Sequence, residues 1–100
     1  MTQEVLILFS RKGCCLCEAL EEHLLHISLV NLEPSVVLKV LDIDSIDVSL
    51  EERRLYTNEV PVLVLDSHKL DRRIEFPRLS PRLKNDNLFT WLQNKLNNCY

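Results

Sequence analysis

Three cysteines lie within four positions of the chain, in the segment RKGCCLCEAL of residues 11–20. Cys14 and Cys17 have the C-x-x-C spacing, which allows the first turn of a helix to bring two thiols within disulfide distance. At a helix N-terminus, unpaired N–H groups and the helix dipole stabilise a thiolate, and the charges of Arg11 and Lys12 act in the same direction. We therefore predict a redox-active dithiol with Cys14 as the nucleophile and Cys17 as the resolving thiol.

Two other roles of the cysteines are compatible with their residue type. They could be small buried side chains, but this does not explain why a helix should begin with three of them after Arg11 and Lys12. They could also bind a metal together with His23 and His26. Cys17 and His23 would lie about 9 Å apart along one helix, whereas zinc ligands lie within about 4 Å of one another. We therefore predict no metal site and place both histidines on the surface.

The dithiol chemistry requires a strand before the cysteines and a helix after them. Residues 4–9, EVLILF, form a short apolar run rich in branched side chains, which predicts a strand buried on both faces. From Cys14 onward, apolar residues recur at the spacing of one helical face, and the pattern ends by Pro34. These residues are Leu16, Leu20, Leu24 and Ile27.

A second strand and a second helix follow. Residues 35–44, SVVLKVLDID, are rich in valine and close with two aspartates, which predicts a strand that ends in a turn. Ser49 and Glu52 then have the spacing of a capping box, so we predict a short helix that ends near Tyr56.

The last part of the chain predicts a hairpin and a helix. Residues 59–76 contain two apolar runs joined at 66–69, DSHK, a connection short enough for antiparallel strands. Pro61 must then lie at the start of its strand or at an edge. Asn85 or Asp86 is predicted to cap a final helix. Its inner face would consist of Leu88, Phe89, Leu92 and Leu96.

These elements predict the order β-α-β-α-β-β-α. The helical crossover makes the first two strands parallel and the hairpin adds antiparallel pairing, so the fold class is α/β, with a four-stranded mixed sheet flanked by three helices. A chain of 100 residues with 46% hydrophobic and 27% charged residues suits a single compact domain, which we assign to residues 1–100.

Charge and composition limit the partners and the location. The net charge of −3 argues against nucleic acid, although six basic and two acidic residues between Lys69 and Lys84 indicate a local basic surface. The apolar run near the N-terminus is too short for a signal sequence or a membrane span. Cysteines crowded into one turn do not form a framework of loop-closing disulfides, so we predict a reducing, cytoplasmic compartment. We also expect a monomer with no membrane partner.

The segments LILFSRKGCCLC and YTNEVPVLVLD resemble the short glutaredoxin-like proteins of the thioredoxin superfamily, which have a G-C-x-L-C active site. The resemblance extends over nearly the whole chain in element order. It implies a thioredoxin fold and a thiol-disulfide oxidoreductase that acts on protein or small-molecule disulfides. No cofactor is required, and glutathione is a candidate co-substrate.

The resemblance also implies a substrate-binding surface beside the cysteines. Pro61 would have a cis peptide bond, and the main chain of Val60 would pair with an extended substrate segment. Lys12 and Leu16 would border the docking surface. Arg78, at the end of the last hairpin strand, would lie near the cysteines, and Arg82 close by.

Two departures from the family pattern limit which of the family's properties can be carried over to this chain. Typical glutaredoxins place proline and an aromatic residue between their cysteines, where this chain has Cys15 and Leu16. Their Gly-Gly pair, which helps to hold a glutathione carboxylate, is missing, since Gly13 is the only glycine. Arg78 is predicted to bind such a carboxylate instead. Cys15 and Cys99 are assigned no role, and a non-enzymatic adaptor or an iron-sulfur cluster protein is the alternative function.

Overall fold

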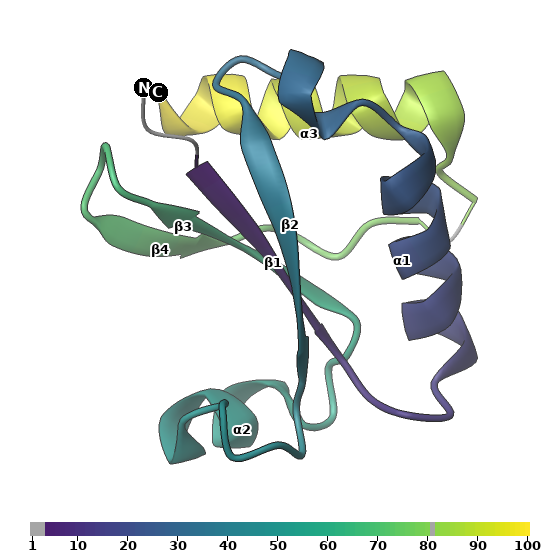
Figure 1. The fold of residues 1–100 in the computed structure, drawn as a ribbon, viewed down its shortest axis with the longest axis vertical. Helices are drawn as coiled ribbons and strands as arrows, with labels where there is room; N and C mark the ends of the chain where they lie inside the picture. Colours follow the sequence, from purple (N-terminus) through teal and green to yellow (C-terminus); the bar gives the residue numbers. More distant parts are fainter. Residues whose placement is uncertain (1–3, 81) are drawn as a thin grey trace.

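The structure is a computed structural model that describes residues 4–80 and 82–100 (Figure 1). Within these residues the strands form one four-stranded mixed sheet, and the element order confirms the predicted β-α-β-α-β-β-α arrangement of an α/β, thioredoxin-like fold. A short 3₁₀ helix, η1, is added after the first α-helix. The elements are β1 (Glu4–Ser10), α1 (Cys15–His26), η1 (Leu29–Asn31), β2 (Val36–Asp42), α2 (Leu50–Tyr56), β3 (Val62–Ser67), β4 (Arg72–Glu75) and α3 (Asn85–Cys99).

The strand order in the sheet is β2-β1-β3-β4. β1 and β2 are parallel, with Leu6 opposite Leu38, because the chain crosses over through α1 between them. β3 is antiparallel to both β1 and β4, which confirms the predicted hairpin. The hairpin connection covers residues 68–71, two positions later than predicted, because β3 continues to Ser67.

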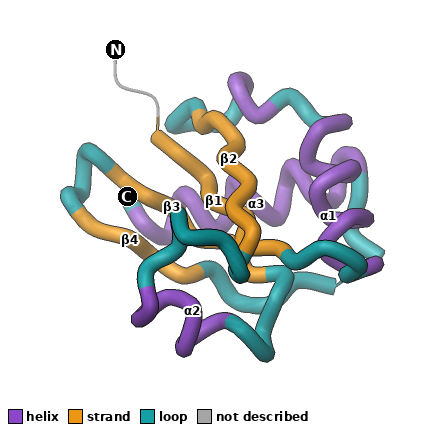
Figure 2. The backbone as a smooth tube through the Cα atoms, turned by 60° about the horizontal axis from the view of Figure 1, so that its bottom comes forward, coloured by secondary structure: helices purple, strands orange, loops and turns teal. Residues whose placement is uncertain are grey.

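The central strand β1 supplies both sides of the core, as its uninterrupted apolar run predicts. Leu6 and Leu8 face α1 and α3, and Ile7 and Phe9 face the side of α2. All four side chains are at most 1% exposed, and burying a side chain of this size stabilises the fold by about 1.5 to 3 kcal/mol. Figure 2 shows the same division, with α1 and α3 on one face of the sheet and α2 on the other. The strand end that leads to the cysteines is thus firmly anchored.

Helix α3 packs its inner face on the larger core through Leu88, Leu92 and Leu96, as predicted, while Phe89 is only partly buried. The predicted N-cap at Asn85 or Asp86 is wrong. Lys84 is the N-cap, and its carbonyl accepts from Leu88 N–H. Lys84 has the extended backbone of an N-cap residue, whereas Asn85 has a left-handed φ of 54°. Neither α3 nor any other helix of the described residues is long and apolar enough to cross a membrane.

Candidate active site at the N-terminus of α1

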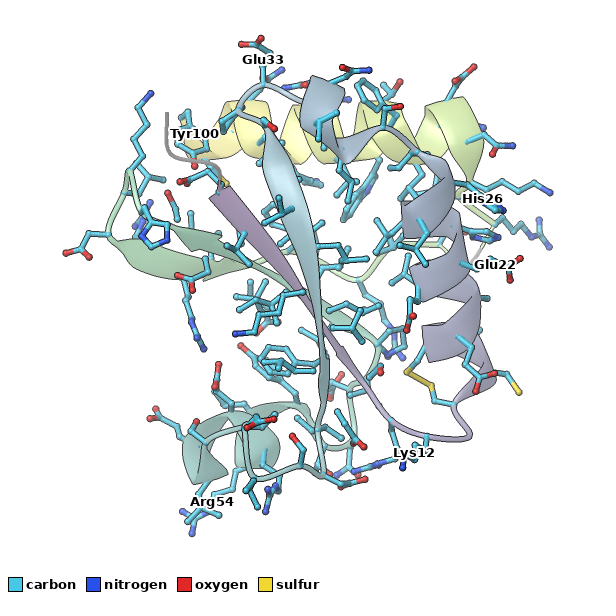
Figure 3. All side chains as sticks on the ribbon, viewed as in Figure 1. Lys12, Glu22, His26, Glu33, Arg54 and Tyr100 are labelled. Carbon is cyan, nitrogen blue, oxygen red and sulfur yellow. A yellow bond between two sulfur atoms is a disulfide. The ribbon has the colours of Figure 1, made fainter. Side chains whose placement is uncertain are left out.

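Cys14 and Cys17 form a disulfide at the start of α1, which Figure 3 shows as the bond between two sulfur atoms. Their Cα atoms are 5.2 Å apart, within the usual range for a disulfide. Cys14 is the N-cap residue, so the helix begins one position later than predicted, and its Sγ accepts a hydrogen bond from Cys17 N–H at 3.2 Å. The sequence spacing therefore produces the predicted dithiol pair.

The turn between β1 and α1 presents these cysteines. Cys14 N–H donates to the carbonyl of Arg11 at 3.1 Å, which closes the turn. Gly13 has φ of 79°, a left-handed conformation that is strained for other residues. The only glycine of the chain thus lies directly before Cys14, where the turn requires a positive φ.

The two sulfur atoms differ in accessibility. Cys17 is 1% exposed, whereas Cys14 is partly exposed. Of the two sulfur-bearing side chains, only that of Cys14 is therefore accessible from solvent. This asymmetry is the arrangement that the roles predicted for the two cysteines require.

A pocket lies between α1 and the segment that follows β4, and Leu16, which stands between the two cysteines in the sequence, lines it. It contains three of the predicted substrate residues, Leu16, Pro61 and Arg78. Leu16 is 51% exposed, although it belongs to the apolar face of the helix. The peptide bond between Val60 and Pro61 is cis, as is the bond between Glu33 and Pro34. The remaining lining consists of Ala19, Leu20, His23, Leu79, Ser80 and Leu83.

The structure does not bring the other two predicted substrate residues into this pocket. Lys12 is exposed in the turn before α1, and Val60 is partly buried against the core on the α2 side. His23, which the sequence placed on the surface, is partly exposed and lines the pocket. The spacing of Leu16, Leu20 and His23 along one helical face was a signal that could have found it.

A comparison with protein-family models matches residues 5–93 to the glutaredoxin-like domain (DUF836). The chain belongs to this glutaredoxin-like family. No curated protein and no solved structure gave a significant match. The family and the disulfide-distance C-x-x-C pair together fit a redox role, and the resemblance predicted from the active-site segment is confirmed.

Two arginines of the basic stretch between Lys69 and Lys84 form ion pairs with different acidic residues. Arg73 pairs with Glu52 and, at 3.8 Å, with Asp66. Arg78 pairs with Glu59 at 3.9 Å, and both side chains are more than half exposed. Such an exposed pair contributes about 0 to 1 kcal/mol. The pair therefore does little to hold the Arg78 side chain in place.

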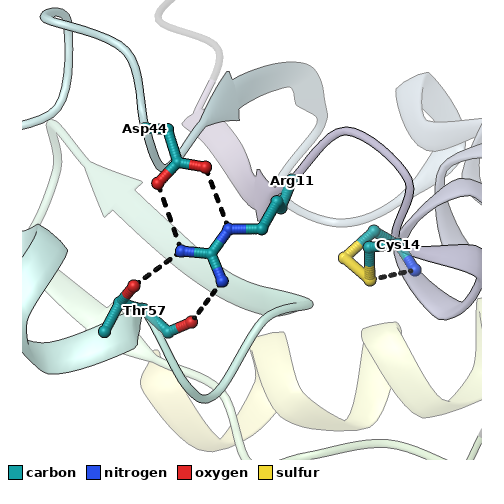
Figure 4. Close-up of a disulfide and its surroundings, with 5 residues drawn as sticks. Arg11, Cys14, Asp44 and Thr57 are labelled. Carbon is teal, nitrogen blue, oxygen red and sulfur yellow. Dashed lines mark hydrogen bonds and ion pairs between the residues drawn. A yellow bond between two sulfur atoms is a disulfide. The ribbon is translucent and has the colours of Figure 1, made fainter.

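Arg11 does not direct its charge at the cysteines of the glutaredoxin-like site. Its guanidinium points away from the disulfide and lies between Asp44 and Thr57 (Figure 4). The hydrogen bonds to Asp44 raise the pKa of Arg11 and lower the pKa of the Asp44 carboxyl. The sequence predicted that Arg11 supports a thiolate by its charge, and the structure shows that this charge is already paired.

Among residues 4–80 and 82–100, no three His, Cys, Asp or Glu side chains are grouped so that they could hold a metal ion. His26 is exposed on α1, away from the pocket lining. Cys15 is an exposed free thiol and Cys99 is a partly buried one. Burial raises the pKa of Cys99, which disfavours its thiolate.

Proposed function

We propose that this glutaredoxin-like protein is a thiol-disulfide oxidoreductase that acts through Cys14 and Cys17 on protein or small-molecule disulfides. The observation that carries the proposal is the pairing of a partly exposed sulfur with a buried one at the N-terminus of α1. Thiolates at helix N-termini are favoured by the helix dipole, and an exposed one is available for attack.

The reaction proceeds in two exchange steps. First, the Cys14 thiolate attacks a substrate disulfide, so that a Cys14-substrate bond forms, the substrate S–S bond breaks and one substrate thiolate leaves. Next, Cys17 loses its proton and attacks Cys14 Sγ, which releases the second substrate thiolate and forms the Cys14–Cys17 disulfide. Each released thiolate takes a proton from solvent. The substrate gains two electrons, and a thiol reductant such as glutathione restores the dithiol.

The pocket beside Leu16 and Pro61 supports the docking part of this proposal. A substrate held at Cys14 would lie over Leu16, and an extended segment of it would pair with the main chain of Val60. Lys12, in the turn beside Cys14, would meet an acidic group of the substrate. The pocket walls are mainly aliphatic, which favours apolar side chains near the reacting cysteine.

The location and partners belong to the same proposal. Exposed Cys15 and the free thiol of Cys99 suit a reducing compartment, so we propose a cytoplasmic protein. We propose that it acts as a monomer, with thiols and disulfides as partners and without nucleic acid or membrane binding.

The decisive test is the reduction potential of the Cys14 and Cys17 pair. The protein is equilibrated in glutathione redox buffers and the labelled thiols are counted by mass spectrometry. A reversible two-electron transition between about −180 and −280 mV is expected, the range of known thiol oxidoreductases. Absence of such a transition would refute dithiol exchange and favour the adaptor or cluster-binding alternative.

Replacement of Arg78 by alanine tests how the protein binds a substrate carboxylate. We expect KM for a glutathionylated peptide to rise about two- to fivefold, because one exposed ionic contact contributes up to about 1 kcal/mol. The measurement is steady-state reduction of that peptide. Arg72→Ala, which removes the same charge from β4 outside the pocket, is the matched control. Equal KM values for R78A and wild type would remove Arg78 from the substrate site.

A further inference from the structure

Arg11 connects three segments that are far apart in the sequence. It follows β1 directly and lies three residues before Cys14. Its Nε and Nη2 donate to the Asp44 carboxylate, at 2.9 and 3.2 Å, in the loop between β2 and α2. Its Nη1 and Nη2 donate to the Thr57 carbonyl at 3.0 Å and hydroxyl at 2.6 Å, at the C-cap of α2. A planar guanidinium can form two such pairs of hydrogen bonds at once, here called the double fork, and an ammonium group cannot reproduce this geometry.

Helix α2 needs such contacts because it has little apolar anchorage. None of its seven residues is buried, and its main packing contact is Tyr56 against the ring of Phe9, with centroids 5.1 Å apart. The remainder of α2 is attached to the protein by polar contacts. Arg53 donates to the carbonyls of Ile43 and Ser45, at 3.1 and 2.7 Å, which fixes α2 to the preceding loop. Arg11 joins this unit to the turn that carries Cys14 through its side chain, beside the backbone hydrogen bond from Ile43 N–H to the Ser10 carbonyl at 2.8 Å.

The segment that leaves α2 leads directly to the proposed docking residues. Thr57 is followed three positions later by Val60 and then by Pro61, which lines the pocket beside Leu16. A contact that fixes Thr57 relative to the turn before Cys14 therefore also limits how far Val60 and Pro61 can move from the nucleophile. Local segments with few buried apolar contacts are those that open most readily when such a contact is removed.

We propose that Arg11 is a positioning residue, which holds the Val60–Pro61 segment in place relative to Cys14 through Asp44 and Thr57. The inference rests on the proposed function, because it assumes that a disulfide substrate docks on the Val60–Pro61 segment. It differs from a charge effect on the thiolate in a measurable way, since lysine at position 11 keeps the charge but loses the double fork.

The test compares R11A and R11K with wild type in the full chain. Loss of positioning should raise KM for a peptide disulfide roughly tenfold in both variants with little change in kcat, because docking contacts are the same in ground and transition states. The pH profile of iodoacetamide alkylation at Cys14, measured with reduced protein, should not move. Arg54→Ala, an exposed residue of the same helix, is the matched control and should behave as wild type.

The opposite pattern would overturn the proposal. If R11K matches wild type in KM while R11A shifts the alkylation profile, Arg11 acts by charge. If R11A does not fold, Thr57→Val takes its place, because it removes only the hydrogen bond to the Thr57 hydroxyl. T57V should give a smaller rise in KM than R11K does. An unchanged KM in T57V would contradict the positioning role.

A second readout separates this inference from the proposed function. Hydrogen-deuterium exchange of the amides in residues 57–60 should be faster in R11A than in wild type and in R54A. If wild type reduces no disulfide, the proposed function fails, and the exchange rates still decide whether Arg11 holds the segment. Unchanged exchange in R11A would refute that role by itself.

Discussion

Replacement of Cys14 by serine should reduce disulfide exchange to the uncatalysed background, a loss of at least about a thousandfold, as expected when an enzyme loses its nucleophile. Cys14 is the partly exposed sulfur of the pair, and the buried Cys17, 1% exposed, cannot replace it without opening the first turn of α1. Reduction of a peptide disulfide under saturating reductant measures the effect.

Cys17→Ser should behave differently from Cys14→Ser. The first attack needs only Cys14, so C17S should accumulate a mixed disulfide that is detectable as a mass increase equal to one substrate half. C14S should not form it. Cys15→Ser is the matched control, since it makes the same change at an exposed thiol outside the disulfide and should leave turnover unchanged. A mixed disulfide in C14S but not in C17S would reverse the two roles.

The fold was predictable because local and global signals agree. The apolar run of β1 and the leucine spacing of α1 each allow one assignment, and the element order then leaves few topologies. Ser49 was correctly identified as a helix cap, with its Oγ accepting from Glu52 N–H at 3.1 Å. Boundaries differ by one or two residues, since β-strand ends depend on partners that the sequence does not show.

The parts of the site that sequence could not predict depend on contacts between distant residues. The partners of Arg11 are 33 and 46 positions away, so only the folded chain shows that its charge is paired. The second wall of the pocket comes from the segment after β4, where only Arg78 was expected near the cysteines, and that expectation came from the family resemblance. In contrast, the pairing of Cys14 with Cys17 was predictable from the sequence, because it depends only on the spacing of two residues within one helical turn.

Glu4, outside the site, is likewise held by contacts with residues distant in the sequence. It is the first residue of β1 and only 1% exposed, although its side chain is acidic. Its carboxylate accepts from the Tyr100 hydroxyl and from His68 N–H at 3.1 Å, and Tyr100 Oη lies 3.0 Å from Ser67 Oγ. Burial raises the pKa of Glu4, but these hydrogen bonds outweigh it and the pKa is lowered. The network joins the end of α3 to β1 and the β3–β4 hairpin.

Glu4→Gln and Tyr100→Phe should each lower the free energy of unfolding at pH 7 by about 1.5 to 3 kcal/mol, the contribution of a hydrogen bond to a charged group. Denaturant unfolding of both variants and of the double mutant should show a coupling of similar size, because the two groups form one contact. Glu33→Gln makes the same change at an exposed carboxylate and is the control. Equal stabilities of E4Q and E33Q would contradict a stabilising network.

The pH dependence of the same variants gives this prediction a definite sign. The pKa of Glu4 is lowered from 4.5, so its stabilisation is present above the unfolded pKa and is lost as pH falls through the folded pKa. The difference between wild type and E4Q should therefore shrink on acidification. Burial, and then the hydrogen bond to Glu4, raises the pKa of Tyr100 to about 12. Wild type should accordingly lose stability as pH rises from about 10 to 12. Y100F, which has no ionisable hydroxyl at this position, should lose less over that range, and parallel alkaline curves would show that Tyr100 is not held by the carboxylate.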